Sequence, residues 1–449
     1  MTTEWHKWQI AEYTQLDQYE TQETFGLPCR MPPNANVLNL LWTYVYKEAE
    51  KRFKSCCVCN GSPTRKGTVM LAETYASSLE QTGSRIFWAI TAIHNYIVVG
   101  TDASDAFAEA PHPKAPLYVY LDKPFREWWQ HKGYSALHPS HNVMRVKKAL
   151  QGHPESPRLW ANLIDNITND LGFLPCHHGP CLYYNPNYNG HKLFFIRQVD
   201  DFAISAPTTT IANSIIASIN SKMTVQIKSI RLVNRFNGVD ISQTSSYVKI
   251  SNKTYIEMIL RDKNWLHASI PGQYSPAYIP MHSDPEFNKT IEEADPISEK
   301  ELKCVEKGAG FSYKQGKWEL IYALVTCCPD IYFSLIKLAQ YSTKPALLRF
   351  QVLQGIYQYL KDTKIEGIHY WRTALRTDCP ILPLHTQRTD YNNYTPHSSR
   401  LTTIPTIFNI QVDASYAGDT THRCSVTGIV AHLAGGCILY KKNSRCSRP

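Results

Sequence analysis

Two adjacent acidic residues, Asp200 and Asp201, lie between two apolar runs in the segment 194–206, "FFIRQVDDFAISA". A third acid, Asp102, follows another apolar run in "YIVVGTDASDAF". Each run has the composition of a buried strand, so the carboxylates lie at the edge of a core, where an unpaired charge is costly. Divalent cations would offset that charge, and two Mg²⁺ ions held by carboxylates on neighbouring strands are the usual means of nucleotidyl transfer.

A plainer interpretation of these acids stays open at this point. A two-residue acidic turn is common in β-hairpins, and Asp102 could simply end a strand. The pair Asp200 and Asp201, taken alone, favours the acidic turn. The choice therefore depends on the rest of the sequence.

Composition restricts the class of protein. The 449 residues are enough for two to four domains, and 47 Lys and Arg against 38 Asp and Glu give a net charge of +9, which favours a polyanionic partner. The 13 cysteines follow no repeated spacing, so free thiols are expected rather than a disulfide framework. "CHHGPC" at 176–181 lacks the paired spacing of a structural zinc site, and no apolar run is long enough for a membrane span.

The elements that must position the acids follow from periodicity and turn residues. We expect a helix over 4–24, an extended linker to 29, and then two strands joined by a charged turn within 37–61. Further helices are expected at 72–94, 155–173 and 253–263 and over much of 317–363, a polar loop at 270–300, and a linker beyond 376. Strand alternation resumes in the tail from 406.

Several motifs occur in one order along the chain: "DASDAFAEAP", "ALQGHPESPRLW", "RQVDDFA" and "FNGVDI". Together they resemble the reverse transcriptase of copia-type LTR retrotransposons, from about residue 5 to the C-terminus. The resemblance implies an α+β fold like a right hand, with fingers and palm at 30–245 after an N-terminal helix and linker at 1–29. It implies thumb, connection and linker at 246–405 and a truncated ribonuclease H-like α/β fold at 406–449.

The resemblance also implies roles for individual residues. Asp102, Asp200 and Asp201 would be catalytic and, with the Ala103 carbonyl, would bind Mg²⁺ or Mn²⁺. The residues expected to bind the dNTP are Lys54, Phe107, Gln151 and Gly152. Phe107 would exclude a 2′-hydroxyl, although core packing is an equally acceptable role for it. Asp105 is interpreted as a bystander.

Two positions depart from the family pattern. Cys56 and Cys328 each stand where relatives have arginine, and a thiol cannot make the bidentate contacts of a guanidinium. In the tail, "IQVDASYAG" resembles the first strand of a ribonuclease H domain, with Asp413 at the first metal carboxylate. The sequence ends before the further acids of that site, so ribonuclease H activity is not expected.

The function implied is RNA-directed DNA polymerisation, in which a primer 3′-hydroxyl attacks a dNTP. The implied partners are an RNA or DNA template with its primer, dNTPs and other parts of an element polyprotein, with no membrane. The implied location is the cytoplasm, in a virus-like particle, or the nucleus. An alternative of another class is a decayed or domesticated fragment that binds nucleic acid without polymerising; Cys56 and Cys328 favour it.

Overall fold

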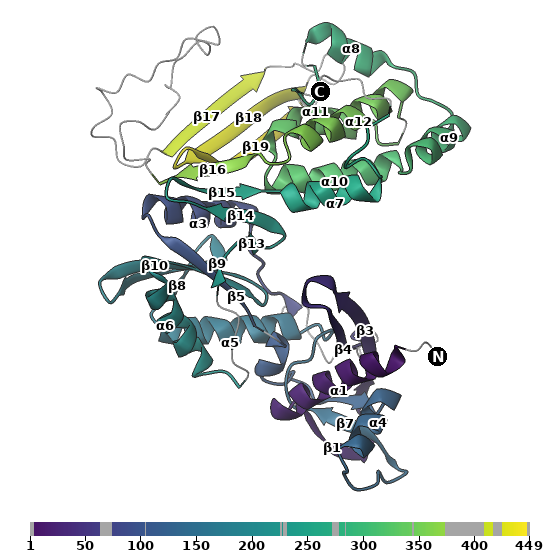
Figure 1. Ribbon diagram of the computed structural model, residues 1–449, viewed down its shortest axis with the longest axis vertical. Helices are drawn as coiled ribbons and strands as arrows, with labels where there is room; N and C mark the ends of the chain where they lie inside the picture. The colour runs from purple at the N-terminus through teal and green to yellow at the C-terminus, as the bar shows by residue number, and fades with distance from the viewer. Residues whose placement is uncertain are drawn as a thin grey trace. The chain divides into compact units, whose positions relative to one another are not determined.

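A computed structural model describes residues 4–62, 74–103, 105–224, 227, 231–271, 278–282, 284–343, 345–372, 408–415 and 424–446. The chain forms two compact units. The first comprises residues 1–79 and 99–231, and the second comprises 80–98 and 232–449. Helices alternate with mainly antiparallel sheets in both units, which confirms the predicted α+β class (Figure 1).

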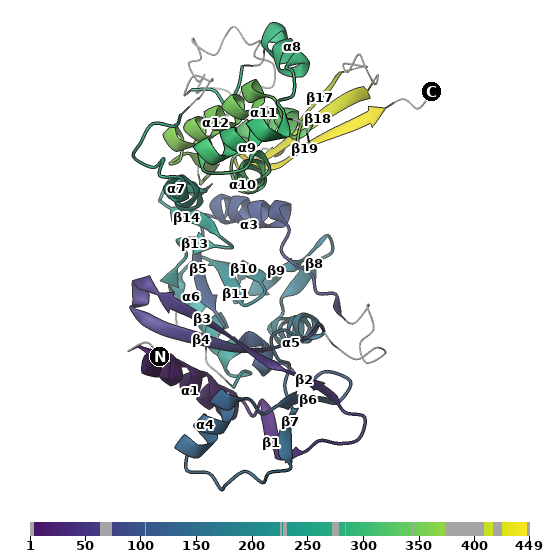
Figure 2. The same cartoon turned by 90° about the vertical axis from the view of Figure 1, so that its right-hand side faces the viewer.

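The two strands predicted within 37–61 form a long hairpin in the first unit. β3 (Leu40–Lys47) and β4 (Arg52–Cys59) pair antiparallel on either side of a short 3-10 helix at Glu48–Glu50, as the charged turn predicted. Helix α1 (Trp5–Thr21) lies along this hairpin (Figures 1 and 2). The Trp8 and Phe53 rings meet edge to face at 4.5 Å, and the Tyr19 hydroxyl donates to the Cys57 carbonyl at 2.7 Å.

The predicted linker after α1 is partly wrong. Residues Phe25–Arg30 form strand β1 at the edge of a sheet of order β1-β7-β6-β2, with β2 (Asn36–Leu38), β6 (Leu117–Tyr120) and β7 (His141–Val146). Proline lacks an amide donor and is confined to edge strands or bulges. Pro28 fits here because β1 is an edge strand with a register shift before it. Helix α4 (Lys123–His131) follows β6.

A second sheet in this unit carries the acids. Its strands run in the order β12 (Arg231–Leu232), β5 (Ile97–Asp102), β11 (Asp201–Ala206), β10 (His191–Gln198), β9 (Gly179–Tyr188) and β8 (Leu174–Cys176). β10 and β11 form the predicted hairpin, from Phe194↔Ser205 to Gln198↔Asp201. The helix predicted at 155–173 is α5 (Ser156–Asp170), and helix α6 (Thr209–Asn220) follows the hairpin.

The second unit contains a sheet of order β13-β14-β15-β16 and a helical core. The strands are β13 (Arg235–Phe236), β14 (Val239–Gln243), β15 (Tyr247–Ser251) and β16 (Gly367–Trp371). The helices are α7 (Lys253–Asp262), α8 (Pro285–Glu293), α9 (Glu299–Ala309), α10 (Tyr313–Thr326), α11 (Tyr332–Ala339) and α12 (Leu347–Asp362). A buried apolar cluster lies between α7, α10, α11 and α12.

Two predicted elements of this unit need correction. The helix expected at 72–94 is shorter, since α3 spans only Gln81–Ile93. The loop expected at 270–300 contains α8, which begins where the Asp284 side chain accepts a hydrogen bond from the Phe287 amide and proline occupies the first turn. The linker predicted beyond 376 lies largely outside the described residues.

The tail forms an antiparallel sheet of β17 (Phe408–Ser415), β18 (Cys424–Leu433) and β19 (Gly436–Cys446). This sheet packs against other elements of the second unit. The Tyr370 hydroxyl donates to the Cys437 carbonyl at 3.1 Å, and Arg85 of α3 stacks on the Tyr440 ring. β17 is an edge strand of this sheet, and its side chains Phe408, Ile410 and Val412 are exposed to solvent.

Within the described residues, no helix combines the length and apolar character that crossing a membrane requires.

Candidate active site

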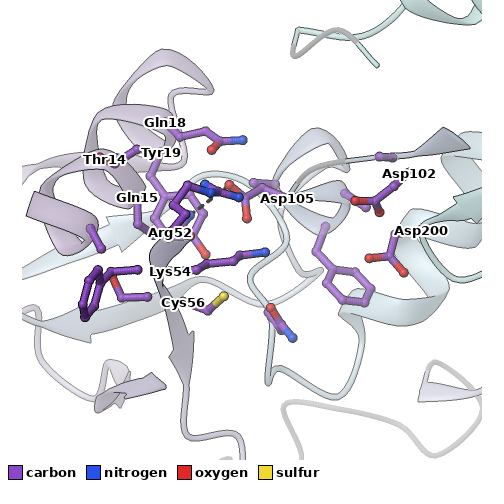
Figure 3. A pocket seen from close by; sticks show the side chains of 18 of the residues that line it. Thr14, Gln15, Gln18, Tyr19, Arg52, Lys54, Cys56, Asp102, Asp105 and Asp200 are labelled. Carbon is purple, nitrogen blue, oxygen red and sulfur yellow. Dashed lines mark hydrogen bonds between the residues drawn. The ribbon is translucent and has the colours of Figure 1, made fainter. Parts of the chain in front are cut away.

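The chain brings Asp102 and Asp200 to neighbouring strands of one sheet. Asp102 is the last residue of β5, and Asp200 lies in the two-residue turn between β10 and β11. The Ala103 amide donates a 3.0 Å hydrogen bond to the Asp200 carbonyl, which joins the end of β5 to that turn. The two carboxylates face the same space in Figure 3. The sequence predicted this juxtaposition.

The turn that carries Asp200 is strained. Val199, its first residue, has a φ of 55°, a conformation that β-branched residues rarely adopt. Such a residue costs about 1 to 3 kcal/mol and persists only where the surroundings hold it. Here the Trp160 indole Nε1–H of α5 donates a 2.7 Å hydrogen bond to the Val199 carbonyl. α5 therefore helps to fix the position of Asp200.

A cavity of about 600 Å³ opens in front of these acids (Figure 3). The predicted site residues that line it are Lys54, Asp102, Ala103, Phe107, Gln151 and Asp200. Asp201 and Gly152, which were also predicted, are not among its lining residues. The structure thus brings together six of the eight residues named for catalysis, metal binding and dNTP binding.

The acids of the site repel one another. The Asp200 side chain is exposed, yet the protein atoms around it displace part of its solvent and raise its pKa; Asp102 raises that pKa further and Lys54 lowers it. Burial raises the pKa of Asp201 to about 6, with contributions from Asp200 and Asp102. A cation between the carboxylates would relieve this repulsion.

The donor set suits a magnesium ion that is bound partly by substrate. Among the described residues, no three His, Cys, Asp or Glu side chains are arranged to hold a metal ion by themselves. Mg²⁺ is commonly bound by one or two carboxylates together with water and substrate phosphates. Asp102 and Asp200 fit that pattern, and Asp201 adds negative potential from outside the cavity.

Asp105, interpreted from the sequence as a bystander, adjoins the predicted site residues in the structure. It lines the cavity, and its φ of 47° places it in the left-handed region just before the 3-10 helix Ala106–Glu109, which carries Phe107. The Gln15 side-chain amide donates a 2.9 Å hydrogen bond to its carboxylate. Burial raises the pKa of Asp105, whereas Gln15 and Lys54 act in the opposite direction.

Helix α1 was not expected in the site but forms one side of the cavity. Thr14, Gln15, Gln18 and Tyr19 lie along that side in Figure 3, and Lys7 lines the same cavity. The period of about 3.6 residues in α1 indicated a buried face. It did not indicate that this face would meet Asp105, which is 90 residues away in sequence.

Strand β4 contributes Lys54 and Cys56 to the cavity. Residues two apart on a strand point to the same face, so both side chains can reach the cavity. Cys56 therefore occupies a position from which a guanidinium could reach a bound nucleotide. Cys328, the other departure, lies in the second unit, where it packs against the helical core and burial raises the pKa of its thiol to about 12.

Gly152 has a backbone role. Its φ is 94°, and a Cβ atom built there would lie 2.0 Å from the Cys59 carbonyl oxygen. The Cys59 amide donates a 2.8 Å hydrogen bond to the Gln151 carbonyl, which joins the end of β4 to the segment that holds Gln151. Only glycine allows this approach.

The residue singled out in the tail, Asp413, lies on β17 in the second unit. It is exposed and pairs with Gly428 of β18.

Comparison with known proteins assigns the chain to a family. Residues 22–281, more than half of the chain, match the family model "Reverse transcriptase (RNA-dependent DNA polymerase)". The chain belongs to this family, and the match includes both aspartates, Lys54 and the remaining cavity residues from position 22 onward.

The curated relatives are transposon polyproteins. The chain is 20% identical over 448 residues to the retrovirus-related Pol polyprotein from transposon TNT 1-94 of Nicotiana tabacum, covering 97% of this chain and 29% of that protein. It is 21% identical over 368 residues to the Pol polyprotein from transposon RE1 of Arabidopsis thaliana, covering 81% and 23%. These relatives confirm the resemblance to a copia-type retrotransposon reverse transcriptase. The chain spans less than a third of the length of either relative.

A solved structure of a foamy viral protease-reverse transcriptase, in complex with double-stranded DNA, matches at a TM-score of 0.39 and 13% identity. The match covers 96% of this chain and 55% of the viral chain. The family assignment rests on the sequence matches rather than on this likeness.

Proposed function

We propose that the chain is the RNA-directed DNA polymerase of a copia-type retrotransposon. One observation carries the proposal: two carboxylates from neighbouring strands, a lysine and a nucleotide-sized cavity occur together in the first unit. These are the groups that nucleotidyl transfer needs. The carboxylates would hold divalent ions, and the lysine would meet the negative charge of a triphosphate.

The six predicted residues that line the cavity have defined tasks in this proposal. Asp102 and Asp200, with the Ala103 carbonyl, would hold Mg²⁺ or Mn²⁺, and those ions would supply activation of the primer 3′-hydroxyl and stabilisation of the leaving pyrophosphate. Lys54 would bind the triphosphate, and Gln151 would contact the sugar. Phe107, which is half-buried on the cavity surface, would exclude a 2′-hydroxyl.

The partners proposed are a primed RNA or DNA template and dNTPs, with other parts of an element polyprotein as neighbours. The net charge of +9 supports a polyanionic partner. A location in cytoplasmic virus-like particles or in the nucleus follows from the same proposal. For the tail, the antiparallel strands β17–β19 and Asp413 support a ribonuclease H-like fold.

A second candidate function is that of a decayed or domesticated fragment that binds nucleic acid without polymerising. The specific observation in its favour is that Cys56 lines the cavity, at a position where the family resemblance implies an arginine. The thiol cannot provide a charge-assisted contact to a phosphate. The two candidate functions predict the same affinity for nucleic acid, but only the first predicts catalysis.

Primer extension on an RNA template, in the presence of Mg²⁺, separates the two. The polymerase proposal predicts incorporation of dNTPs that disappears in Asp200→Asn, while the affinity of both proteins for the primed template stays equal. Binding of the primed template without incorporation of dNTPs would support the second candidate, a fragment that does not polymerise.

A further inference from the structure

Three side chains of β4 face the candidate site at regular intervals. Arg52, Lys54 and Cys56 are each two residues apart, so they share one face of the strand, and all three line the cavity. The intervening Phe53 and Ser55 also line it, but the Phe53 ring packs against Trp8 and Ser55 is buried, so neither offers a charge to a ligand. Figure 3 shows them projecting from the same side of β4. The three positions form a row along the cavity, with Lys54 in the middle.

The charges along this row are unequal. Lys54 lies close enough to the carboxylates to lower the pKa of both Asp105 and Asp200. Cys56 is uncharged in its thiol form, so the position on one side of Lys54 provides no cation. Arg52, on the other side, carries a guanidinium, which can bind a phosphate through two parallel hydrogen bonds.

The present partner of Arg52 is easily exchanged. Its Nη2 and Nε atoms lie 2.9 Å and 3.1 Å from Glu50 Oε2, and both side chains are about half exposed. An exposed ion pair of this kind contributes little free energy. A triphosphate carries more charge than one carboxylate, so it would compete well for the same guanidinium.

We propose that Arg52 is a nucleotide-binding residue that contacts the triphosphate of the incoming dNTP and so supplies the guanidinium that Cys56 lacks. This inference rests on the proposed function and deepens it. In this inference, the second cation that binds the triphosphate is Arg52, which precedes Lys54 in the row on β4.

Two other cations line the cavity but suit this role less well. Lys51 lies in the turn before β4 with a φ of 47°, so it is not part of the row. Lys7 of α1 is paired with Glu4 at 3.0 Å and lies over the Phe53 ring at 5.2 Å. Neither offers the two-pronged donor geometry of a guanidinium.

Lys47 provides a matched control. It pairs directly with Arg52 across the hairpin and shares its partner, with Nζ 3.0 Å from Glu50 Oε1. It is not among the residues that line the cavity. Lys47→Gln therefore removes the same charge from the same hairpin without removing a cavity cation.

The test is equilibrium binding of dTTP to the full chain on poly(rA) primed with dideoxy-terminated oligo(dT), with Mg²⁺ present. The blocked primer allows binding without chemistry. Arg52→Gln is expected to raise the Kd for dTTP by about ten- to a hundred-fold, and Arg52→Lys by less, because lysine keeps the charge but not the bidentate geometry. Lys47→Gln should leave the Kd within about twofold.

A rescue variant separates this role from a structural one. In the double variant Arg52→Gln, Cys56→Arg, the restored guanidinium should recover most of the affinity for dTTP. Melting temperatures of all variants should agree, since Arg52 is exposed. An Arg52→Gln variant that binds dTTP as tightly as the unmodified chain, or no more weakly than Lys47→Gln, would overturn the inference.

The outcome is distinguishable from failure of the proposed function. If Arg52 governs dTTP binding but an unblocked primer is never extended, the inference stands and the polymerase proposal fails. If primers are extended with a KM for dTTP that is independent of Arg52, the polymerase proposal stands and the inference fails.

Discussion

The indole of Trp160 donates a hydrogen bond of 2.7 Å to the carbonyl of Val199, the strained residue directly before Asp200. Trp160 is fully buried in α5, so this contact joins the turn that carries Asp200 to the core of its own unit. The position of Asp200 therefore depends on a helix far from it in sequence.

Replacing Trp160 by phenylalanine should loosen that turn. The variant keeps an aromatic ring but leaves the Val199 carbonyl without its donor, at a cost of about 1 to 1.5 kcal/mol in the free energy of unfolding. We also expect kcat for primer extension to decrease by about tenfold, because Asp200 is less well fixed. Thermal unfolding and single-nucleotide incorporation measure the two effects.

Trp128 supplies the control for this variant. It is also buried, and its Nε1–H donates to Asp17 at 2.8 Å, away from the Asp200 turn. Trp128→Phe should lower stability by a similar amount without changing kcat. Equal losses of kcat in both variants would show that general destabilisation, and not the turn, is responsible.

Much of the site was predictable because its motifs are local. The apolar runs beside Asp102 and Asp200 indicate buried strands, and the two-residue spacing in β4 places Lys54 and Cys56 on one face. Asp102 and Asp200 lie close together, as expected, because the end of β5 and the turn before β11 belong to one sheet.

The parts that were missed depend on long-range contacts. Nothing local to α1 indicates that Gln15 would reach Asp105, and nothing in the tail indicates that Tyr440 would stack on Arg85. α8 was missed although Asp284 followed by Pro285 is a helix-start signal, because polar surroundings obscured it.

The contact between Gln15 and Asp105 leads to a second prediction. Gln15→Leu removes the hydrogen bond that lowers the pKa of the buried Asp105 carboxyl, so that pKa should rise further. The loss of a donor to a buried carboxylate should cost about 1 to 3 kcal/mol of unfolding free energy. Chemical denaturation measures it, with Gln18→Leu, on the same side of the cavity, as the control. Equal costs for both variants would contradict the assigned role of Gln15.

His153 predicts how stability depends on pH. It is 3% exposed, and burial lowers its pKa to about 4. Between pH 4 and the unfolded value of about 6.5, the unfolded chain binds a proton that the folded chain does not. This contribution of His153 to the free energy of unfolding is therefore complete above pH 6.5 and is lost as the pH decreases toward 4, by about 3 kcal/mol in total.

A His153→Asn variant should lack this dependence. The difference in unfolding free energy between the unmodified chain and the variant should shrink by about 3 kcal/mol from pH 7 to pH 4. Urea denaturation at several pH values measures it. A difference that stays constant over this range would mean that His153 does not titrate as its burial implies.

Asp200 and Asp201 should not be equivalent. Asp200 lines the cavity and Asp201 does not, so Asp200 is the better placed of the two to bind a metal ion together with substrate phosphates. Asp200→Asn should lower kcat by at least about a thousand-fold, and Asp201→Asn by about tenfold, through loss of negative potential. Single-turnover incorporation measures both. Equal losses would restore Asp201 as a full member of a metal-binding triad.

The most direct test of the polymerase assignment is single-nucleotide incorporation by the unmodified chain and by Cys56→Arg, on a primed RNA template with Mg²⁺. We predict that the unmodified chain incorporates dNTPs and that Cys56→Arg raises kcat/KM by up to about tenfold, less than a first charge-assisted contact would, because Arg52 already provides a guanidinium. Asp200→Asn should abolish incorporation in both backgrounds. If neither form extends a primer while both bind the hybrid, the chain is not a polymerase and the central claim is contradicted.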